Sequence, residues 1–482
     1  MGARLGAKAI DFVTLLVLAR FLTPSDFGLV TIAMSLIYIV EAIFELPLEQ
    51  ALVRLDDIRP GHLDTTFTLS ALRGAAVMIA LVSLAWPFAY FYDDTRLIPL
   101  ICLLSLAPTA RGLLSPRLVL FVKQLDYRRD FVVQLGGKVT ALCVASALAL
   151  STRSYWSIGA GTVATPLAMV VISYVLAPYR PRASLSQKHV FLKFLGWTSA
   201  AQVVTAFSWQ CDRLVLGKFV SHSMLGAFSM ASDLAAMPDQ ALIKPIARPL
   251  ISAFVLVRQD LVRLREAYAK ATSTALIVGL PFALGLSLLA GPAIELAMGS
   301  KWLAAAPNLQ WLALAPVPAL FVMPLGALAI SLDRPDIFLR QSVAGLCIKL
   351  PLVTGGIIWF GLPGAIFSLL SASVLITLVS MRFVKRLVGT PFYIQGLGAW
   401  RVLVSAAVLT VTLLLVRHTL SGVHDLELLV RCAAVGVCSF GLYVATLFVL
   451  WWNAGRPAGL ESTVYNSLCS LWYKCRRLGS FG

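Results

Sequence analysis

Two stretches of this chain resemble each other closely enough to indicate an internal duplication. Residues 19–33 and residues 217–231 align without a gap, and each reads as the end of one apolar helix, a short polar turn and the start of the next. The identical pairs are Phe21/Phe219, Ser25/Ser223, Gly28/Gly226 and Ala33/Ala231. A duplicated helical hairpin in an apolar chain is typical of membrane proteins that are built from two related lobes.

A second pair of segments follows in the same order. Residues 99–108 and residues 307–316 both begin and end with proline and share three further apolar positions. The alternative explanation is chance similarity between two helices rich in Leu and Ala. Because both pairs keep their order within each half of the chain, duplication is the better interpretation.

Composition places the chain in a membrane. It is 59% hydrophobic and only 13% charged, with a mean hydropathy of +0.84. Soluble domains carry about 25% charged residues, and a membrane-spanning helix needs ~20 mostly apolar residues. We therefore predict an all-α integral membrane protein.

We expect about fourteen transmembrane helices in two six-helix repeat lobes plus two extra C-terminal helices. The N-terminal lobe is expected in residues 1–180, the C-terminal lobe in 181–385, the additional helices in 386–452 and a basic cytoplasmic tail in 453–482. The expected spans are 5–22, 26–46, 66–92, 97–121, 131–150, 156–176, 191–219, 224–244, 271–289, 306–331, 341–360, 362–383, 401–417 and 426–452.

The net charge of +17 has a membrane explanation. Lys and Arg gather in the loops of one side, as they do in the cytoplasmic loops of membrane proteins, and anionic membrane lipids attract them. We predict that both termini are cytoplasmic and that nucleic acid is not a partner. Residues 245–270 are expected to form an amphipathic surface helix, and docking of a cytoplasmic partner there is the alternative.

Cysteine and histidine give no sign of a metal or cofactor. The eight cysteines lack metal or disulfide spacing, and the five histidines lie in loops or at helix ends. We therefore assign no metal, no cofactor and no catalytic residue.

Three stretches that overlap the repeated segments carry a family resemblance. Residues 18–28, residues 212–219 and residues 299–314 resemble the first hairpin, the end of the seventh helix and the ninth-to-tenth connection of the Wzx-type polysaccharide flippases. These proteins belong to the multidrug/oligosaccharidyl-lipid/polysaccharide exporter superfamily. The resemblance implies a carrier of an undecaprenyl-diphosphate-linked oligosaccharide across the bacterial inner membrane, for exopolysaccharide or lipopolysaccharide biosynthesis. It also implies contact with other polysaccharide assembly proteins.

Charged side chains inside spans are functional candidates, because burying a charge in a bilayer is costly. Arg111 and Lys349 lie within expected spans and could bind an anionic diphosphate headgroup, with pairing inside a lobe as the alternative. Arg20, Lys218 and Lys244 lie near span ends, where they could line the same cavity or extend to the membrane surface.

Acidic residues in the spans are candidates for ion coupling. Glu41 and Asp239 occupy matching positions in the two repeats, and Glu45 shares a helix face with Glu41. They could take up a proton or cation, or each could neutralise a base on a neighbouring helix.

Other functions remain open at this stage. A lipid-linked peptidoglycan precursor exporter or a drug exporter could have the same fold. A polysaccharide polymerase or a glycosyltransferase fits less well, since the outer loops are short and no acidic metal-binding motif lies near a membrane face. A transporter without enzymatic activity, moving its substrate by alternating access, is the favoured interpretation.

Overall fold

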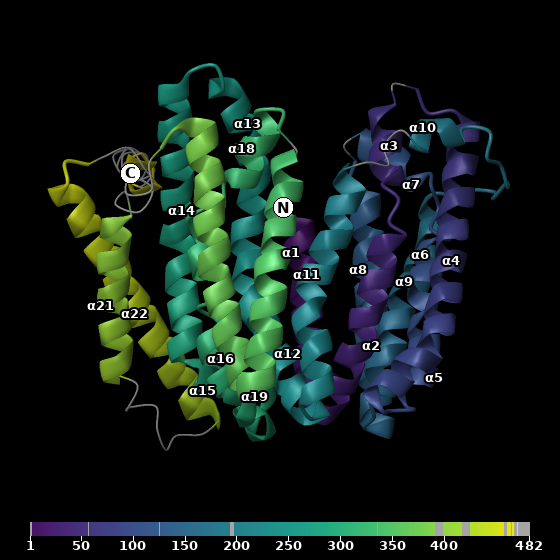
Figure 1. Cartoon of the computed structure of the whole chain (residues 1–482), viewed down its shortest axis with the longest axis horizontal. Helices are drawn as coiled ribbons and strands as arrows, with labels where there is room; N and C mark the ends of the chain where they lie inside the picture. Colours follow the sequence, from purple (N-terminus) through teal and green to yellow (C-terminus); the bar gives the residue numbers. More distant parts are fainter. Residues whose placement is uncertain are drawn as a thin grey trace, which may run out of the picture. The chain divides into compact units, whose positions relative to one another are not determined.

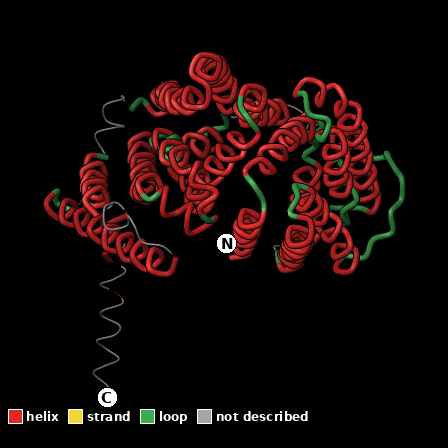
Figure 2. The backbone as a smooth tube through the Cα atoms, turned by 90° about the horizontal axis from the view of Figure 1, so that it is seen from below, coloured by secondary structure: helices red, strands yellow, loops and turns green. Residues whose placement is uncertain are grey.

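The computed structural model describes residues 2–482 apart from 56, 125, 193–196, 335, 391–398, 417–424, 457–459, 464, 467–469 and 471–482. Within those residues every regular element is a helix (Figure 2). The prediction of an all-α membrane protein is therefore confirmed. Seven of the described helices are long and apolar enough to cross a membrane, and a bent pair, Ser300–Leu312 with Val317–Ser331, would make an eighth.

The helices of the N-terminal part follow the expected spans (Figure 1). They are α1 (Gly2–Phe21), α2 (Pro24–Ile43), α3 (Leu48–Arg54), α4 (Pro60–Tyr92), α5 (Leu97–Leu104), α6 (Leu106–Arg111), α7 (Leu118–Lys123), α8 (Arg128–Thr152) and α9 (Trp156–Leu176). The span expected at 97–121 is broken at Ser105. Pro108 explains the break, because its ring excludes the carbonyl of the residue four positions earlier, Leu104, from continuous helix.

The remaining helices cover the second half of the chain. They are α10 (Lys188–Leu192), α11 (Trp197–Phe219), α12 (His222–Pro238), α13 (Lys244–Val257), α14 (Leu261–Leu288), α15 (Ala290–Met298), α16 (Ala306–Leu312), α17 (Val317–Leu320), α18 (Leu325–Ser331), α19 (Asp336–Val388), α21 (Trp400–Val416) and α22 (Asp425–Asn453). A π-helical turn, η1 (Asp239–Ile243), follows α12, and a 3₁₀ turn, η2 (Ser300–Ala305), follows α15. Gly361, at φ +61°, interrupts α19 between the two spans expected there.

The sequence predicted that the apolar side of an amphipathic helix at 245–270 meets the membrane surface, and this prediction is wrong for Phe254 and Leu264. α13 and the start of α14 cover these residues, and Phe254 and Leu264 are fully buried. Both belong to a core cluster with Tyr268 and Leu328, so neighbouring helices cover the face that the sequence suggested would meet lipid.

The chain divides into two compact units. Unit 1 contains residues 1–230, 297–302 and 345–365, and unit 2 contains residues 231–296, 303–344 and 366–482. These units cut across the expected lobes, since α11 and residues 345–365 of the α19 segment belong to unit 1. The lobe boundaries given above stay predictions.

The duplicated stretch forms two helical hairpins, as predicted. α1 ends at Phe21 and α2 begins at Pro24, and the second copy has the same turn between α11 and α12. Thr23 caps α2, because its hydroxyl accepts the Asp26 amide at 3.3 Å while the Asp26 carboxylate accepts the Thr23 amide at 3.0 Å.

The two copies also pack against each other within unit 1. A Cβ built on Gly28 would lie 1.9 Å from the His222 carbonyl oxygen, and one built on Gly226 would lie 1.8 Å from the Pro24 carbonyl oxygen. Pro24 and His222 occupy matching positions in the repeat, so the contact is the same from both sides. Backbone meets backbone at this point, which only glycine permits.

The 3₁₀ turn η2 covers the end of α1. The Lys301 ammonium donates hydrogen bonds to the carbonyl oxygens of Arg20, at 2.8 Å, and Leu22, at 2.6 Å. The buried Trp302 indole donates to the Ala19 carbonyl oxygen at 2.8 Å. The last carbonyls of a helix lack partners within the helix, and a cation there is favourable.

We predict that Gly226→Ala destabilises the protein, since the new methyl group overlaps the Pro24 carbonyl. The expected cost is about 1–3 kcal/mol, measured as a lower thermal midpoint of the purified protein in detergent. Gly285→Ala is the matched control, because nothing lies within 4 Å of a Cβ there. Equal midpoints for the two variants would contradict the close approach of the repeats.

Candidate functional site

Arg111 is bound by an acid from α2. Its guanidinium lies 2.5 Å from the Glu41 carboxylate. The break at Ser105 turns the chain into α6, whose last residue is Arg111, and Glu41 lies in the last turn of α2. The Arg111 side chain is 46% exposed, whereas the Glu41 side chain is 16% exposed. The pair therefore consists of an accessible cation and a sheltered anion.

A second acid just beyond α2 repeats this arrangement, although the helix ends before Glu45 and the helix face expected to carry both acids does not reach it. Glu45 follows the end of α2 and forms an ion pair with Arg73 of α4. Burial raises the pKa of the Glu45 carboxyl above its ordinary value, although Arg73 acts in the opposite direction. Glu41 and Glu45 thus each neutralise a base on a neighbouring helix, which was the alternative interpretation of these acids.

A third pair was not assigned from the sequence. The Lys138 ammonium, on α8, lies 2.6 Å from the Asp11 carboxylate on α1. Lys138 is followed by apolar residues of α8, and its position well inside that helix could have identified it. Its side chain is 29% exposed and that of Asp11 is 51% exposed.

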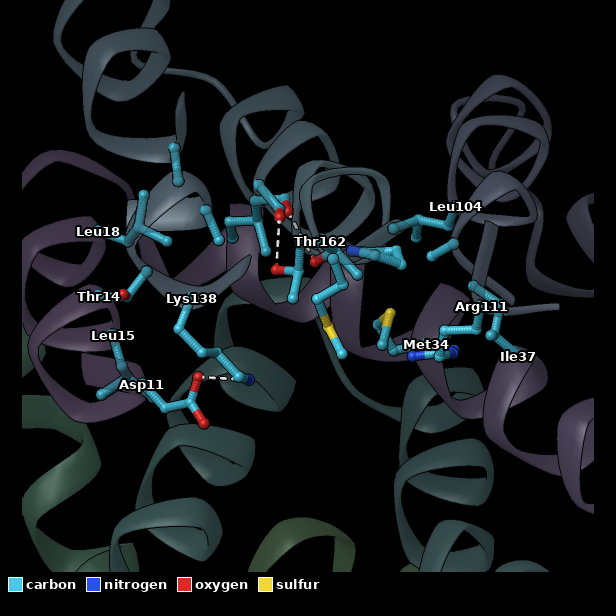
Figure 3. Close-up of a pocket in the computed structure, with 18 of the residues that line it drawn as sticks. Asp11, Thr14, Leu15, Leu18, Met34, Ile37, Leu104, Arg111, Lys138 and Thr162 are labelled. Carbon is cyan, nitrogen blue, oxygen red and sulfur yellow. Dashed lines mark hydrogen bonds and ion pairs between the residues drawn. The ribbon is translucent and has the colours of Figure 1, made fainter. Parts of the chain in front are cut away.

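Arg111 and Lys138 line one pocket of unit 1 (Figure 3). The pocket has a volume of about 440 Å³, within the range of ~300–1,000 Å³ that is usual for small-ligand sites. Helices α1, α2, α8 and α9 supply most of its wall, together with the α5–α6 segment. Polar side chains are added by Asp11, Thr14, Tyr38, Thr162 and Thr165, and the remaining lining is apolar.

This pocket combines the features of a site for an anionic amphiphile. Figure 3 shows Lys138 directed at Asp11, with Arg111 near Met34 and Ile37 at another part of the wall. Guanidinium and ammonium groups bind phosphate oxygens, and the threonine hydroxyls and Tyr38 can hydrogen-bond sugar hydroxyls. At rest each cation is neutralised by its own acid.

Lys349 lies in a different place, within the α19 segment of unit 1. Its ammonium donates to the Ser208 carbonyl oxygen at 2.6 Å and lies 3.4 Å from the Asp212 carboxylate. Both side chains are largely buried, and Asp212 belongs to α11. Lys349 is therefore paired inside the expected C-terminal lobe, and it does not line the pocket with Arg111.

The other predicted cations occupy helix ends. Arg20 lies exposed in the last turn of α1. Lys218, near the end of α11, is 2.8 Å from the Asp93 carboxylate and donates to the Phe91 carbonyl oxygen at 2.5 Å. Lys244 begins α13, but its side chain lies outside the described residues. Asp239 begins the π-helical turn η1, in unit 2.

A cluster beside Lys218 was missed from the sequence. The Arg96 guanidinium binds the buried Asp94 carboxylate at 2.7 Å, and His222 Nε2 lies 3.5 Å from the same carboxylate. Burial alone would raise the pKa of Asp94, but hydrogen bonds from Arg96 outweigh it and hold that pKa below its ordinary value. Burial lowers the pKa of His222. Charge thus joins the turn between α4 and α5 to the second copy of the repeat.

Within the described residues, no group of three or more His, Cys, Asp or Glu side chains could hold a metal ion.

The fold is that of known membrane transporters. A solved structure of the lipid II flippase MurJ, in an inward closed conformation, matches 94% of this chain and 99% of its own, with a TM-score of 0.68 and 13% identity. An inward-facing multidrug resistance transporter of the MATE family matches 80% of this chain and 94% of its own, with a TM-score of 0.67 and 12% identity. The chain is a multi-pass, all-helical membrane protein of this fold.

Sequence comparison places the chain more narrowly. A family model described as polysaccharide biosynthesis protein matches residues 17–307, so the chain belongs to that family. It is 23% identical to the lipopolysaccharide biosynthesis protein WzxC of Escherichia coli over 81% of this chain and 80% of that protein. It is 25% identical to the succinoglycan biosynthesis transport protein ExoT of Rhizobium meliloti, over 65% of this chain and 64% of that protein. The resemblance to the Wzx type is thereby confirmed.

We predict that removing one partner of the Lys349–Asp212 pair lowers the free energy of unfolding more than removing both charges does. Lys349→Met leaves a buried carboxylate without its cation, which costs about 3–5 kcal/mol. Combining it with Asp212→Asn should restore most of the loss in thermal unfolding measurements. A double variant that is as unstable as Lys349→Met would contradict this assignment.

We predict that His222 makes the protein less stable in mild acid. Its pKa lies below the ordinary value of 6.5, so the folded state favours the neutral ring. That stability is present above pH 6.5 and is lost as the pH falls toward the lowered pKa. The charged groups around the ring are Asp94, whose pKa Arg96 holds below its ordinary value, and the Lys218–Asp93 pair. His222→Gln should therefore show a smaller drop in thermal midpoint between pH 7.5 and 5.5. Equal drops in both proteins would contradict this role.

Proposed function

We propose that this protein is a flippase that moves an undecaprenyl-diphosphate-linked oligosaccharide across the bacterial inner membrane. The oligosaccharide would serve exopolysaccharide or lipopolysaccharide biosynthesis, and the carrier would work by alternating access. The observation that carries the proposal is the pocket of unit 1, where Arg111 and Lys138 face a space large enough for a headgroup. Family membership and the transporter fold support it.

The pocket suits the chemistry of such a headgroup. A diphosphate diester carries two negative charges, which a guanidinium binds through two parallel hydrogen bonds. Sugars attached to the diphosphate present hydroxyls to Thr162, Thr165 and Tyr38 and apolar faces to the remaining wall. We assign binding of the headgroup first to Arg111. Arg20, Lys218, Lys244 and Lys349, of which Lys349 is paired with Asp212 outside the pocket, are proposed as further binding residues.

Ion coupling is assigned to the acids on α2 and their counterpart in the second repeat. Glu41 and Glu45 hold Arg111 and Arg73 at rest, so a change at either arginine alters the environment of an acid. Asp239 occupies the position of the second repeat that matches Glu41. A proton or a cation is the proposed coupling ion, and transport without enzymatic catalysis is the proposed activity.

The lipid part of the substrate would stay in the bilayer. We propose that α21 and α22 provide a surface for the polyprenyl chain, since exposed apolar side chains such as Leu415, Val437 and Val449 lie on them. Both termini would be cytoplasmic, where the basic tail meets anionic lipids. Other polysaccharide assembly proteins are the proposed partners. Deleting the two helices without loss of transport would overturn their role.

Two alternative functions can be distinguished from the proposed one, an exporter by its substrate and a polymerase by its product. An exporter of lipid-linked peptidoglycan precursor or of drugs would have the same fold. A polysaccharide polymerase would change the length of the glycan without changing the side of the membrane on which its precursor lies.

We predict that cells without this gene accumulate lipid-linked oligosaccharide on the cytoplasmic face of the inner membrane. Wild-type protein should restore export, and Arg111→Ala should lower it by about tenfold or more, since a charge-assisted pair contributes roughly 1.5–3 kcal/mol. The measurement is the precursor on each face, with membrane insertion checked by immunoblot.

Arg263→Ala is the matched control, because this arginine is exposed and paired only locally with Asp260. Normal crossing of the precursor in cells without the gene, together with altered chain length, would overturn the flippase proposal in favour of polymerisation.

A further inference from the structure

The Arg111–Glu41 pair is built so that a ligand can reach only one of its members. Arg111 lines the pocket and nearly half of its side chain is exposed, whereas Glu41 is sheltered behind it. An anion that enters the pocket therefore meets the guanidinium first. A headgroup that binds through two parallel hydrogen bonds competes with the Glu41 carboxylate for the Nη2 of Arg111, which lies 2.5 Å from Glu41 Oε1.

When the anion displaces Glu41 from Arg111, the Glu41 carboxylate loses the cation that neutralised it. The other arginine nearby, Arg73, is already held by Glu45, and Glu45 itself adds a like charge one helical turn from Glu41. A sheltered carboxylate without its cation, close to a second acid and to an arriving anion, is strongly disfavoured. The charge must be removed for the anion to stay bound.

We propose that an anionic diphosphate headgroup and the Glu41 carboxylate exchange at Arg111, and that Glu41 takes up one proton from water as the headgroup binds. The inference rests on the proposed function and specifies its coupling step. The only bond formed is the O–H bond of the Glu41 carboxyl, and the proton offsets one of the two negative charges that enter.

The second pair of the pocket behaves differently. Asp11 is half exposed, so its carboxylate is less sheltered than that of Glu41 when Lys138 turns away from it. Lys138 can therefore bind the second charge of the headgroup without proton uptake. Lys8 lies three residues before Asp11 on α1 and is the base nearest to it in sequence. One proton per headgroup is the expected stoichiometry, and Glu41 is its acceptor.

The test uses the full-length protein in lipid nanodiscs and farnesyl diphosphoglucose as the probe. This probe is a diphosphate diester, whose two charges do not titrate between pH 6 and 8. Calorimetry at pH 7.5 in two buffers of different ionisation enthalpy gives the protons taken up per probe bound. Wild type should take up about one proton, and its Kd should weaken by up to about tenfold per pH unit on raising the pH.

Glu41→Gln should bind the probe with no proton uptake and with a Kd that does not depend on pH. Glu41→Asp, which keeps the carboxyl, should restore uptake. Glu427→Gln is the matched control, because this acid is exposed and paired with Arg431 on the surface of α22, and it should match wild type.

The outcomes separate this inference from the proposed function. Tight binding by wild type without proton uptake, or uptake that persists in Glu41→Gln, overturns the exchange and leaves the flippase proposal standing. Absence of binding by wild type, or a Kd unchanged by Arg111→Ala, overturns the proposed binding site and the exchange with it. Should Glu41→Gln fail to insert, the pH dependence of the wild-type Kd together with Glu41→Asp decides the matter.

Discussion

Charges inside an apolar protein in a membrane must be neutralised where they lie, because water is not there to solvate them. This chain meets that constraint with ion pairs between different helices. Glu41 and Arg111 join α2 to α6, Asp11 and Lys138 join α1 to α8, and Lys349 and Asp212 join the α19 segment to α11. Each pair fixes the relation of two helices within unit 1. The first two pairs leave the pocket electrically balanced when it is empty.

A balanced pocket has a consequence for transport. A carrier must return without its substrate, and an uncompensated arginine would make that step costly. Acids that occupy the cations in the empty state remove this cost, and they also select for ligands with enough negative charge to displace them. Under the proposed exchange at Arg111, selection for anionic headgroups follows from intramolecular competition as well as from attraction.

Packing between the two copies of the hairpin depends on a different physical feature, which is that glycine has no side chain. Gly28 and Gly226 let the two copies of the hairpin meet backbone to backbone, and Trp302 and Lys301 satisfy the carbonyls at the end of α1. The charged cluster of Asp94, Arg96 and His222 joins the turn between α4 and α5 to the second of these hairpins. The most strongly repeated stretch of the sequence is therefore a contact between its own two copies.

The sequence by itself determined the helical class, the membrane environment, the positions of the helices and the duplicated hairpins, because apolar length, glycine and proline act locally. It also singled out Arg111, Lys349, Glu41 and Glu45, since charge in an apolar stretch is visible without a structure. Only the tertiary structure decided their partners, placed Lys138 in the pocket and turned the apolar face of α13 inward. Pairing joins residues far apart in the chain, and whether a face meets lipid or protein depends on which helices pack beside it.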